Sequence, residues 1–154
     1  MKKLVCLGLA LTLTGCVAST RAASDAEAPE RRIIATDGAP PAIAAYSQGV
    51  QVGRTLYLAG QIGLDPKTRE LAPGGIEAEA RRALENCKAV LEAAGFTLKD
   101  VVQVQVLLAD IGDYNALNQV YVTYFPKDPP ARAAYAVAAL PRGARVEILM
   151  TAAK

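Results

Sequence analysis

The sequence predicts an α+β domain in which two helices cover one face of a sheet, in the element order β-β-β-α-β-α-β-β. Three observations predict this class. Two segments carry apolar residues at helical spacing, six short segments have the composition of strands, and stretches rich in Pro, Gly and Asp separate them. Such an order gives a layered fold with one sheet face left open, and self-association would cover that face.

The first half of the domain is expected to hold three strands and one long helix. Residues 31–36 (RRIIAT) form a short strand, and residues 46–62 form two strands joined by a tight turn at Gly53. Residues 76–95 form the helix, because their apolar side chains recur on one face. Gly95 stands where a C-terminal cap belongs.

The second half is expected to hold one more helix between strands. Residues 101–110 (VVQVQVLLAD) alternate apolar with polar side chains, which predicts a strand with one well-covered face. Residues 113–125 form the second helix, with Asp113 as its N-cap and a stripe of Tyr and Leu side chains in the core. Residues 132–137 and 145–151 form the last two strands.

The N-terminus has the pattern of a bacterial lipoprotein signal peptide over residues 1–15. A positive start (MKK) precedes an apolar stretch that is too short to span a bilayer as a helix and that ends in LTGC. Cleavage before Cys16 would let that residue carry acyl chains, which would hold the chain firmly on a membrane. An ordinary signal peptide with an incidental Cys is the alternative.

Residues 16–30, rich in Ala, Ser and acidic residues, are expected to form a flexible tether, followed by the domain at residues 31–154. Val17 stands where an inner-membrane lipoprotein has Asp. We therefore expect a protein of the cell envelope, lipid-anchored at the outer membrane and facing the periplasm.

Composition excludes several kinds of chemistry. The sequence contains no histidine, so a Cys-His pair, a Ser-His pair and a histidine zinc site are excluded. Cys87 lies on an apolar helix face, which is typical of a small core residue. The formal net charge of +2 falls to zero if Lys2 and Lys3 leave with the signal peptide. No basic patch then remains for nucleic acid.

Two lone charges lie in apolar strand segments: Arg132 in PPARAAYAVAALP and Glu147 in ARVEILM. A buried guanidinium without a partner is costly, so an anion is expected beside Arg132. One interpretation is a structural ion pair with Glu147, or two charged heads that both reach solvent. The other is a ligand carboxylate held by a bidentate fork, with space left by small residues such as Ala134.

Five segments in order resemble signatures of the RidA-like reactive-intermediate deaminases: APPAIAAYSQGVQVG, LAGQIGLDPKT, NQVYVTYF, PPAR and ALPRGARVEI. The resemblance runs from about residue 33 to residue 152. It implies a chorismate-mutase-like α+β fold, a homotrimer and ligand clefts between subunits. It also implies hydrolysis of 2-imino or enamine acids to 2-keto acids and ammonia, without a metal or organic cofactor.

The resemblance implies two main site residues. Arg132 matches the arginine that binds the substrate carboxylate, and Glu147 matches the acidic residue that holds or activates the attacking water. An iminium carbon is already electrophilic, so orientation and modest base catalysis are adequate without histidine. The expected ligand is a small carboxylate, an imino acid.

Further positions follow from the same resemblance. Tyr46 matches a catalytic-site tyrosine after the first strand, Gly60 a glycine whose backbone N–H lies beside the ligand, and Asn118 an asparagine of the second helix. Ala134 is a predicted substrate-binding position where some deaminases carry Cys, and Ala59 stands where many members carry Ser.

Two other functions stay open at this stage. With Ala59 in place of Ser, the chain can be a non-catalytic trimeric module that binds small carboxylates or a partner segment in the cell envelope. It can also be a structural or chaperone-like envelope protein with Arg132 and Glu147 paired internally. In that case apolar replacement of both residues would be neutral or stabilising.

Overall fold

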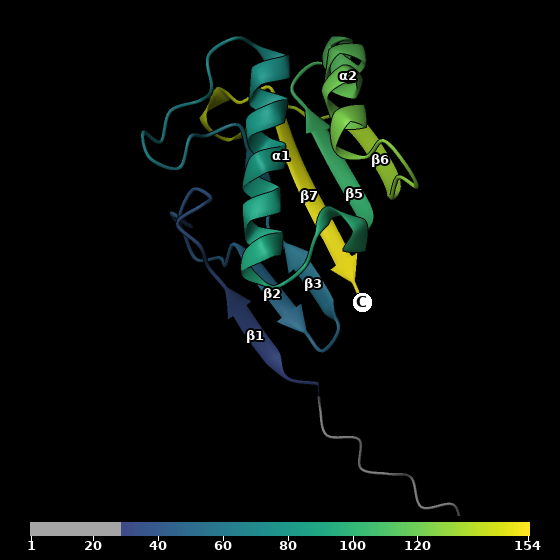
Figure 1. The fold of residues 1–154 in the computed structure, drawn as a ribbon. Coiled ribbons are helices and arrows are strands. Elements are labelled where there is room, and N and C mark those ends of the chain that lie inside the picture. Colours follow the sequence, from purple (N-terminus) through teal and green to yellow (C-terminus); the bar gives the residue numbers. More distant parts are fainter. Residues whose placement is uncertain (1–28) are drawn as a thin grey trace, which may run out of the picture.

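The computed structural model describes residues 29–154, so the predicted signal peptide, Cys16 and most of the predicted tether lie outside it. The described chain forms one sheet with both long helices on the same face, which confirms the predicted α+β class (Figure 1). Its elements, in chain order, are β1 (Arg31–Ile34), β2 (Gly49–Val52), β3 (Thr55–Leu58), β4 (Gln61–Ile62), α1 (Ile76–Ala93), β5 (Val101–Leu108), α2 (Tyr114–Tyr124), β6 (Ala131–Ala136) and β7 (Val146–Ala153), with single 3-10 turns at Leu98–Asp100, Ile111–Asp113 and Pro141–Gly143.

The sheet has seven strands in the order β1-β2-β3-β7-β5-β6, and the short β4 also pairs with β7. Only β5 and β6 pair in parallel among the described strands. β3 pairs with residues 151–153 of β7, whereas β4 pairs with residues 147–148. The chain leaves the sheet at Ala59 and Gly60, between these two pairings. This break lies beside Glu147 and opens space at that point of the sheet.

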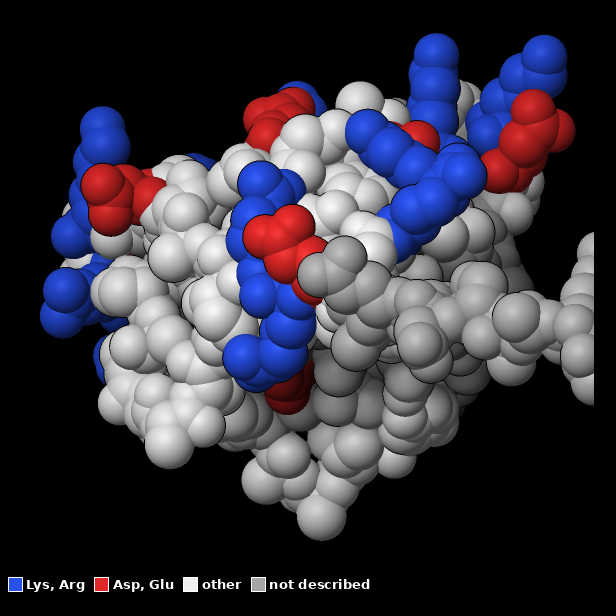
Figure 2. Space-filling model, turned by 90° about the horizontal axis from the view of Figure 1, so that it is seen from below, with Lys and Arg blue, Asp and Glu red and all other residues white. Residues whose placement is uncertain are grey.

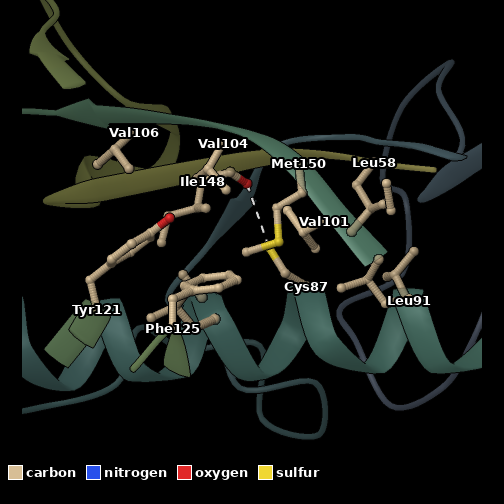
Figure 3. Packing of buried hydrophobic residues seen from close by; sticks show 14 of the residues in the cluster. Leu58, Cys87, Leu91, Val101, Val104, Val106, Tyr121, Phe125, Ile148 and Met150 are labelled. Carbon is tan, nitrogen blue, oxygen red and sulfur yellow. Dashed lines mark hydrogen bonds between the residues drawn. The ribbon is translucent and has the colours of Figure 1, made fainter. Parts of the chain in front are cut away.

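The core lies between the helices and the sheet. Val104 and Val106 on β5, with Ile148 and Met150 on β7, face the helices and are buried (Figure 3). Cys87 lies in the middle of the apolar face of α1, with its Sγ 3.6 Å from the carbonyl oxygen of Ile148. Burial raises the pKa of this thiol, so it stays protonated and packs as a small apolar side chain. The structure thus confirms that Cys87 is a core residue.

The helix ends show one confirmed and one wrong prediction. Gly95 follows the last turn of α1 at a φ of 82°, and its N–H donates to the carbonyl of Glu92 at 2.9 Å, as expected of a C-terminal cap. Asp113 precedes α2 but caps none of its N–H groups. Its two carboxylate oxygens instead accept from Arg145, at 3.0 Å from Nε and 2.7 Å from Nη2. This pair ties the start of α2 to the segment before β7.

On the sheet face away from the helices, Glu147 is the one charged side chain that β5 and β7 present within residues 29–154. Gln103, Gln105 and Leu107 on β5, with Leu149 and Thr151 on β7, are at least partly exposed there. Figure 2 shows Lys and Arg side chains interspersed with Asp and Glu side chains on the described part of the surface seen from below. Residues 29–154 show no large patch of one sign in that view, of the kind that attracts a phosphate backbone.

Candidate active site

A cavity of about 430 Å³ opens beside the break between β3 and β4, and we call it the Glu147 pocket. Its walls come from residues 40–46, residues 59–64, the turn that holds Arg69 and the segment before β7. Its size is typical of a pocket for a small molecule. Most of the lining is apolar, and the side chains that could act on a ligand are Tyr46, Arg69, Arg142 and Glu147.

Glu147 is held in this pocket by strand alternation. Val146 and Ile148 face the core, so the side chain between them points to the opposite face, where it is half-buried. A Cβ atom on Gly60 would overlap the Glu147 carboxylate, so any larger residue at this position would force the Glu147 side chain to move. Burial raises the pKa of the Glu147 carboxyl above its ordinary value, which makes the carboxylate a stronger proton acceptor.

Arg132 lies on the edge strand β6, on the helix side of the sheet. Its register partner on β5 is the buried Val104, so its side chain points toward α2. Its Cζ is 4.4 Å from the centre of the Tyr121 ring and 5.6 Å from that of Tyr114, and its Nη2 donates to the Tyr114 hydroxyl at 3.2 Å. Each ring face stabilises a cation by roughly 0.5–1 kcal/mol at an exposed site. No acidic side chain of residues 29–154 forms an ion pair with Arg132.

Two hollows flank this guanidinium, and we call them together the Arg132 surface. One, of about 460 Å³, is lined by Tyr114, Asn115 and Ala134 among others. The other, of about 320 Å³, is lined by Asn118 and Tyr121 with apolar neighbours. A guanidinium has five N–H donors, and one of them is bound to Tyr114. The remaining donors can bind a planar anion such as a carboxylate.

Arg132 and Glu147 lie on opposite faces of the sheet. Glu147 is the register partner of Leu107, whereas Arg132 is the register partner of Val104. Leu107 and Val104 point to different faces of β5, because side chains alternate along a strand. The predicted internal ion pair between the two charges is therefore wrong. Within one copy, the sheet separates the Arg132 guanidinium from the Glu147 carboxylate.

The six predicted ligand-site residues fall into two groups of three, one on each side of the sheet: Tyr46, Gly60 and Glu147 in the Glu147 pocket, and Asn118, Arg132 and Ala134 at the Arg132 surface. The seventh predicted site residue, Cys16, lies outside the described residues. No group of three His, Cys, Asp or Glu side chains within residues 29–154 could hold a metal ion, so we name no metal ligand.

Four further residues belong to these surfaces but were not predicted as site residues. Tyr114 and Tyr121 belong to the helical stripe that the sequence predicts to be core. The structure shows that their rings lie against the guanidinium of Arg132 on β6. Arg69 and Arg142 lie in turns, where an exposed arginine gives no local signal of a pocket.

Residues 36–154 match the family model described as endoribonuclease L-PSP. The chain belongs to the L-PSP family. A curated relative, the mouse 2-iminobutanoate/2-iminopropanoate deaminase, is 55% identical over 118 residues, which cover 77% of this chain and 87% of the mouse protein. The crystal structure of RidA from an Antarctic Psychrobacter is 48% identical, with a TM-score of 0.77, and the match covers 80% of this chain and 99% of that RidA chain. Escherichia coli TdcF, solved with bound serine, is 36% identical with a TM-score of 0.77, and the match covers 80% of this chain and 98% of the TdcF chain. The resemblance to RidA-like proteins is thereby confirmed.

The predicted location at the outer membrane is wrong by the same comparisons. The family match covers residues 36–154, and the mouse relative, 87% of which is matched, is named 2-iminobutanoate/2-iminopropanoate deaminase. Among residues 29–154, no helix combines the length and the apolar character needed to cross a bilayer. The envelope assignment rested on residues 1–17 alone, which lie outside the described residues.

Proposed function

We propose that this L-PSP protein hydrolyses reactive 2-imino or enamine acids to 2-keto acids and ammonia. The site would join the Glu147 pocket of one copy to the Arg132 surface of the next. The names of the relatives support the reaction, since the mouse protein is called a 2-iminobutanoate/2-iminopropanoate deaminase. The observation that carries the shared site is that Arg132 and Glu147 lie on opposite faces of one sheet.

A homotrimer would supply such sites. In a closed ring, one surface of each copy meets a different surface of the next, so three copies give three equivalent junctions. The sheet face away from the helices, with Leu107 and Leu149 partly exposed, supplies an area that self-association would cover. Each junction would bring one guanidinium to one Glu147 pocket.

Substrate binding would rest on Arg132. Its free N–H groups would hold the α-carboxylate in a bidentate fork, and each charge-assisted hydrogen bond contributes ~1.5–3 kcal/mol when shielded from water. Tyr114 and Tyr121 fix the guanidinium in place, because they hold it on two ring faces and one hydroxyl. Asn118 would contact the substrate from the same hollow as Tyr121.

Hydrolysis would then proceed at the iminium carbon beside Glu147. The carboxylate removes a proton from water as the water oxygen bonds to that carbon and the C=N bond becomes single. Glu147 then returns this proton to the nitrogen of the resulting amino alcohol and accepts the proton of the new hydroxyl group. Ammonia leaves as the C–N bond breaks and the C=O bond forms. The backbone N–H of Gly60 and the hydroxyl of Tyr46 would contact the reacting group, and base assistance of this kind contributes ~10²–10⁴-fold.

RNA cleavage, which the family description names, has less support here. The sequence contains no histidine to act as a general acid or base. The face seen in Figure 2 mixes charges of both signs. Neither feature favours a phosphodiester substrate.

The test is the release of ammonia and keto acid from 2-iminobutanoate generated in situ by an amino-acid oxidase. The wild-type chain should accelerate this release, and Arg132→Ala should lower kcat/KM by about 100-fold, with partial rescue in Arg132→Lys. Arg54→Ala, at the exposed β2–β3 turn, is the matched control. Full activity of Arg132→Ala would refute the proposal. Binding of 2-oxobutanoate by calorimetry without any turnover would support the non-catalytic binding module instead.

A further inference from the structure

The Glu147 pocket contains two guanidinium groups that the proposed hydrolysis does not use. Arg69 and Arg142 both line the cavity, and the Nη2 of Arg142 donates to the carbonyl oxygen of Arg69 at 3.3 Å. Within residues 29–154 neither guanidinium forms an ion pair, and Glu147 is the sole acid among the residues that line the pocket. Two unpaired cations at one cavity favour an anionic ligand group.

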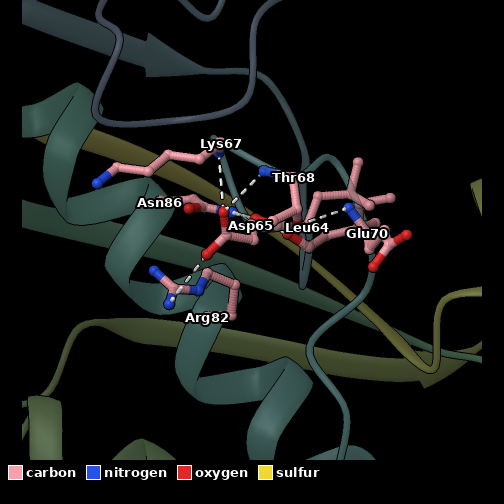
Figure 4. A network of polar contacts seen from close by, with 8 residues as sticks. Leu64, Asp65, Lys67, Thr68, Glu70, Arg82 and Asn86 are labelled. Atoms are coloured by element: carbon pink, nitrogen blue, oxygen red, sulfur yellow. Dashed lines mark hydrogen bonds and ion pairs between the residues drawn. The ribbon is translucent and has the colours of Figure 1, made fainter.

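The turn that carries Arg69 is held by several polar contacts (Figure 4). The Oδ1 atom of Asp65 accepts from the backbone N–H groups of Lys67 at 2.8 Å and Thr68 at 3.1 Å, and these bonds lower the pKa of Asp65. Arg82 of α1 lies 3.5 Å from the other carboxylate oxygen. The N–H of Arg69 itself donates to the carbonyl of Asp65 at 2.9 Å. Arg69 is therefore placed at the pocket by an ordered turn that is tied to α1.

Both arginines also adopt a backbone conformation that favours glycine. Arg69 has a φ of 61° and Arg142 a φ of 62°. A left-handed backbone is uncommon for a residue with a side chain, and such residues concentrate at functional sites. Glycine would adopt both conformations without strain. The presence of arginine at both positions therefore indicates that the side chains have a use.

We infer that Arg69 and Arg142 bind a second carboxylate at the far end of the substrate, so that the site accepts 2-imino dicarboxylic acids. This inference rests on the proposed function. The α-carboxylate would lie on Arg132 of a second copy and the imine carbon beside Glu147. A three- or four-carbon imino acid placed in this way would leave part of the 430 Å³ cavity unfilled. A distal carboxylate would occupy that space and meet both guanidinium groups.

The experiment compares two substrates and three variants. 2-Iminosuccinate and 2-iminobutanoate are generated in situ by suitable amino-acid oxidases, and kcat/KM is measured for each. In Arg69→Gln/Arg142→Gln, the ratio of kcat/KM for the dicarboxylic over the monocarboxylic imine should fall about tenfold or more. Arg69→Lys/Arg142→Lys should retain most of that ratio, and Arg54→Gln should leave it unchanged. Added salt should lower the wild-type ratio, because the groups are exposed.

A ratio unchanged in the glutamine variant would overturn the inference. So would an equal loss on both substrates, which would place the two arginines in subunit assembly. Failure of the proposed function is a separate result: the wild type would then hydrolyse neither imine. In that case calorimetry with 2-oxoglutarate and 2-oxobutanoate tests the subsite alone. The glutamine variant should bind 2-oxoglutarate about tenfold more weakly than the wild type does, and equal affinities would overturn the inference.

Discussion

Gly60→Ala perturbs the candidate site at one atom and without backbone strain, because the φ of Gly60 is not in the left-handed region. The added Cβ would overlap the Glu147 carboxylate and lie 2.7 Å from its Cδ and 2.9 Å from its Cγ. Ordinary contact between carbon atoms is about 3.5–4.0 Å, so the carboxyl group must move by roughly 1 Å. A displacement of this size at a reacting group lowers activity by about 100-fold.

The stability of Gly60→Ala should change much less than its activity. Moving Glu147 to another side-chain conformation costs about 0.5–1.5 kcal/mol. We expect kcat/KM for 2-iminobutanoate to fall by about 100-fold while urea unfolding shows a destabilisation in that range. Circular dichroism should match that of the wild type.

A double-mutant cycle with Glu147→Ala tests the cause of this loss. Glu147→Ala removes the carboxylate, so Gly60→Ala should have no further effect on activity in that background. Full activity of Gly60→Ala, or an equal loss in both backgrounds, would refute the argument that Gly60 acts by giving room to Glu147.

Three further outcomes follow from burial and backbone geometry. Glu147→Gln should abolish the acid limb of the pH profile of kcat/KM. Because ionised Glu147 is disfavoured in the fold, the stability of this variant relative to wild type should rise as the pH increases from the ordinary glutamate pKa through the raised pKa of the folded state. Urea titrations at several pH values would show an opposite trend if this reasoning is wrong. Cys87→Ala should lower stability by roughly 1–2 kcal/mol and leave kcat/KM unchanged, since the thiol is a buried core group; loss of activity in a folded variant would contradict this. Arg69→Gly should raise the free energy of unfolding by about 1 kcal/mol, because glycine adopts the left-handed backbone conformation of this position without strain. A less stable variant would show instead that the Arg69 side chain supports the fold.

The local patterns of the sequence predict most of the fold. The apolar spacing of residues 76–95 predicts α1, and the glycine at its end takes the expected cap position. The turn at Gly53 joins β2 and β3 as expected. These features depend on neighbours within a few residues, so the sequence contains the information that determines them.

Features set by distant partners could not be predicted in this way. Asp113 has the position of a helix cap, but Arg145 lies 32 residues away in sequence and takes its carboxylate. Alternation predicts that Arg132 and Ala134 share a face, but it does not relate that face to the face of Glu147. That relation depends on strand register across β5, which joins β6 on one side and β7 on the other.

Mixed assemblies of two variants of low activity test the central proposal that each site takes Arg132 from one copy and Glu147 from the next. Arg132→Ala and Glu147→Gln chains would be unfolded together in equal amounts, refolded and assayed on 2-iminobutanoate. Random assembly pairs an intact Arg132 with an intact Glu147 at about one junction in four, so about a quarter of wild-type activity should return. Activity no higher than the mean of the two separate variants, in trimers shown by native mass spectrometry to be mixed, would contradict the account.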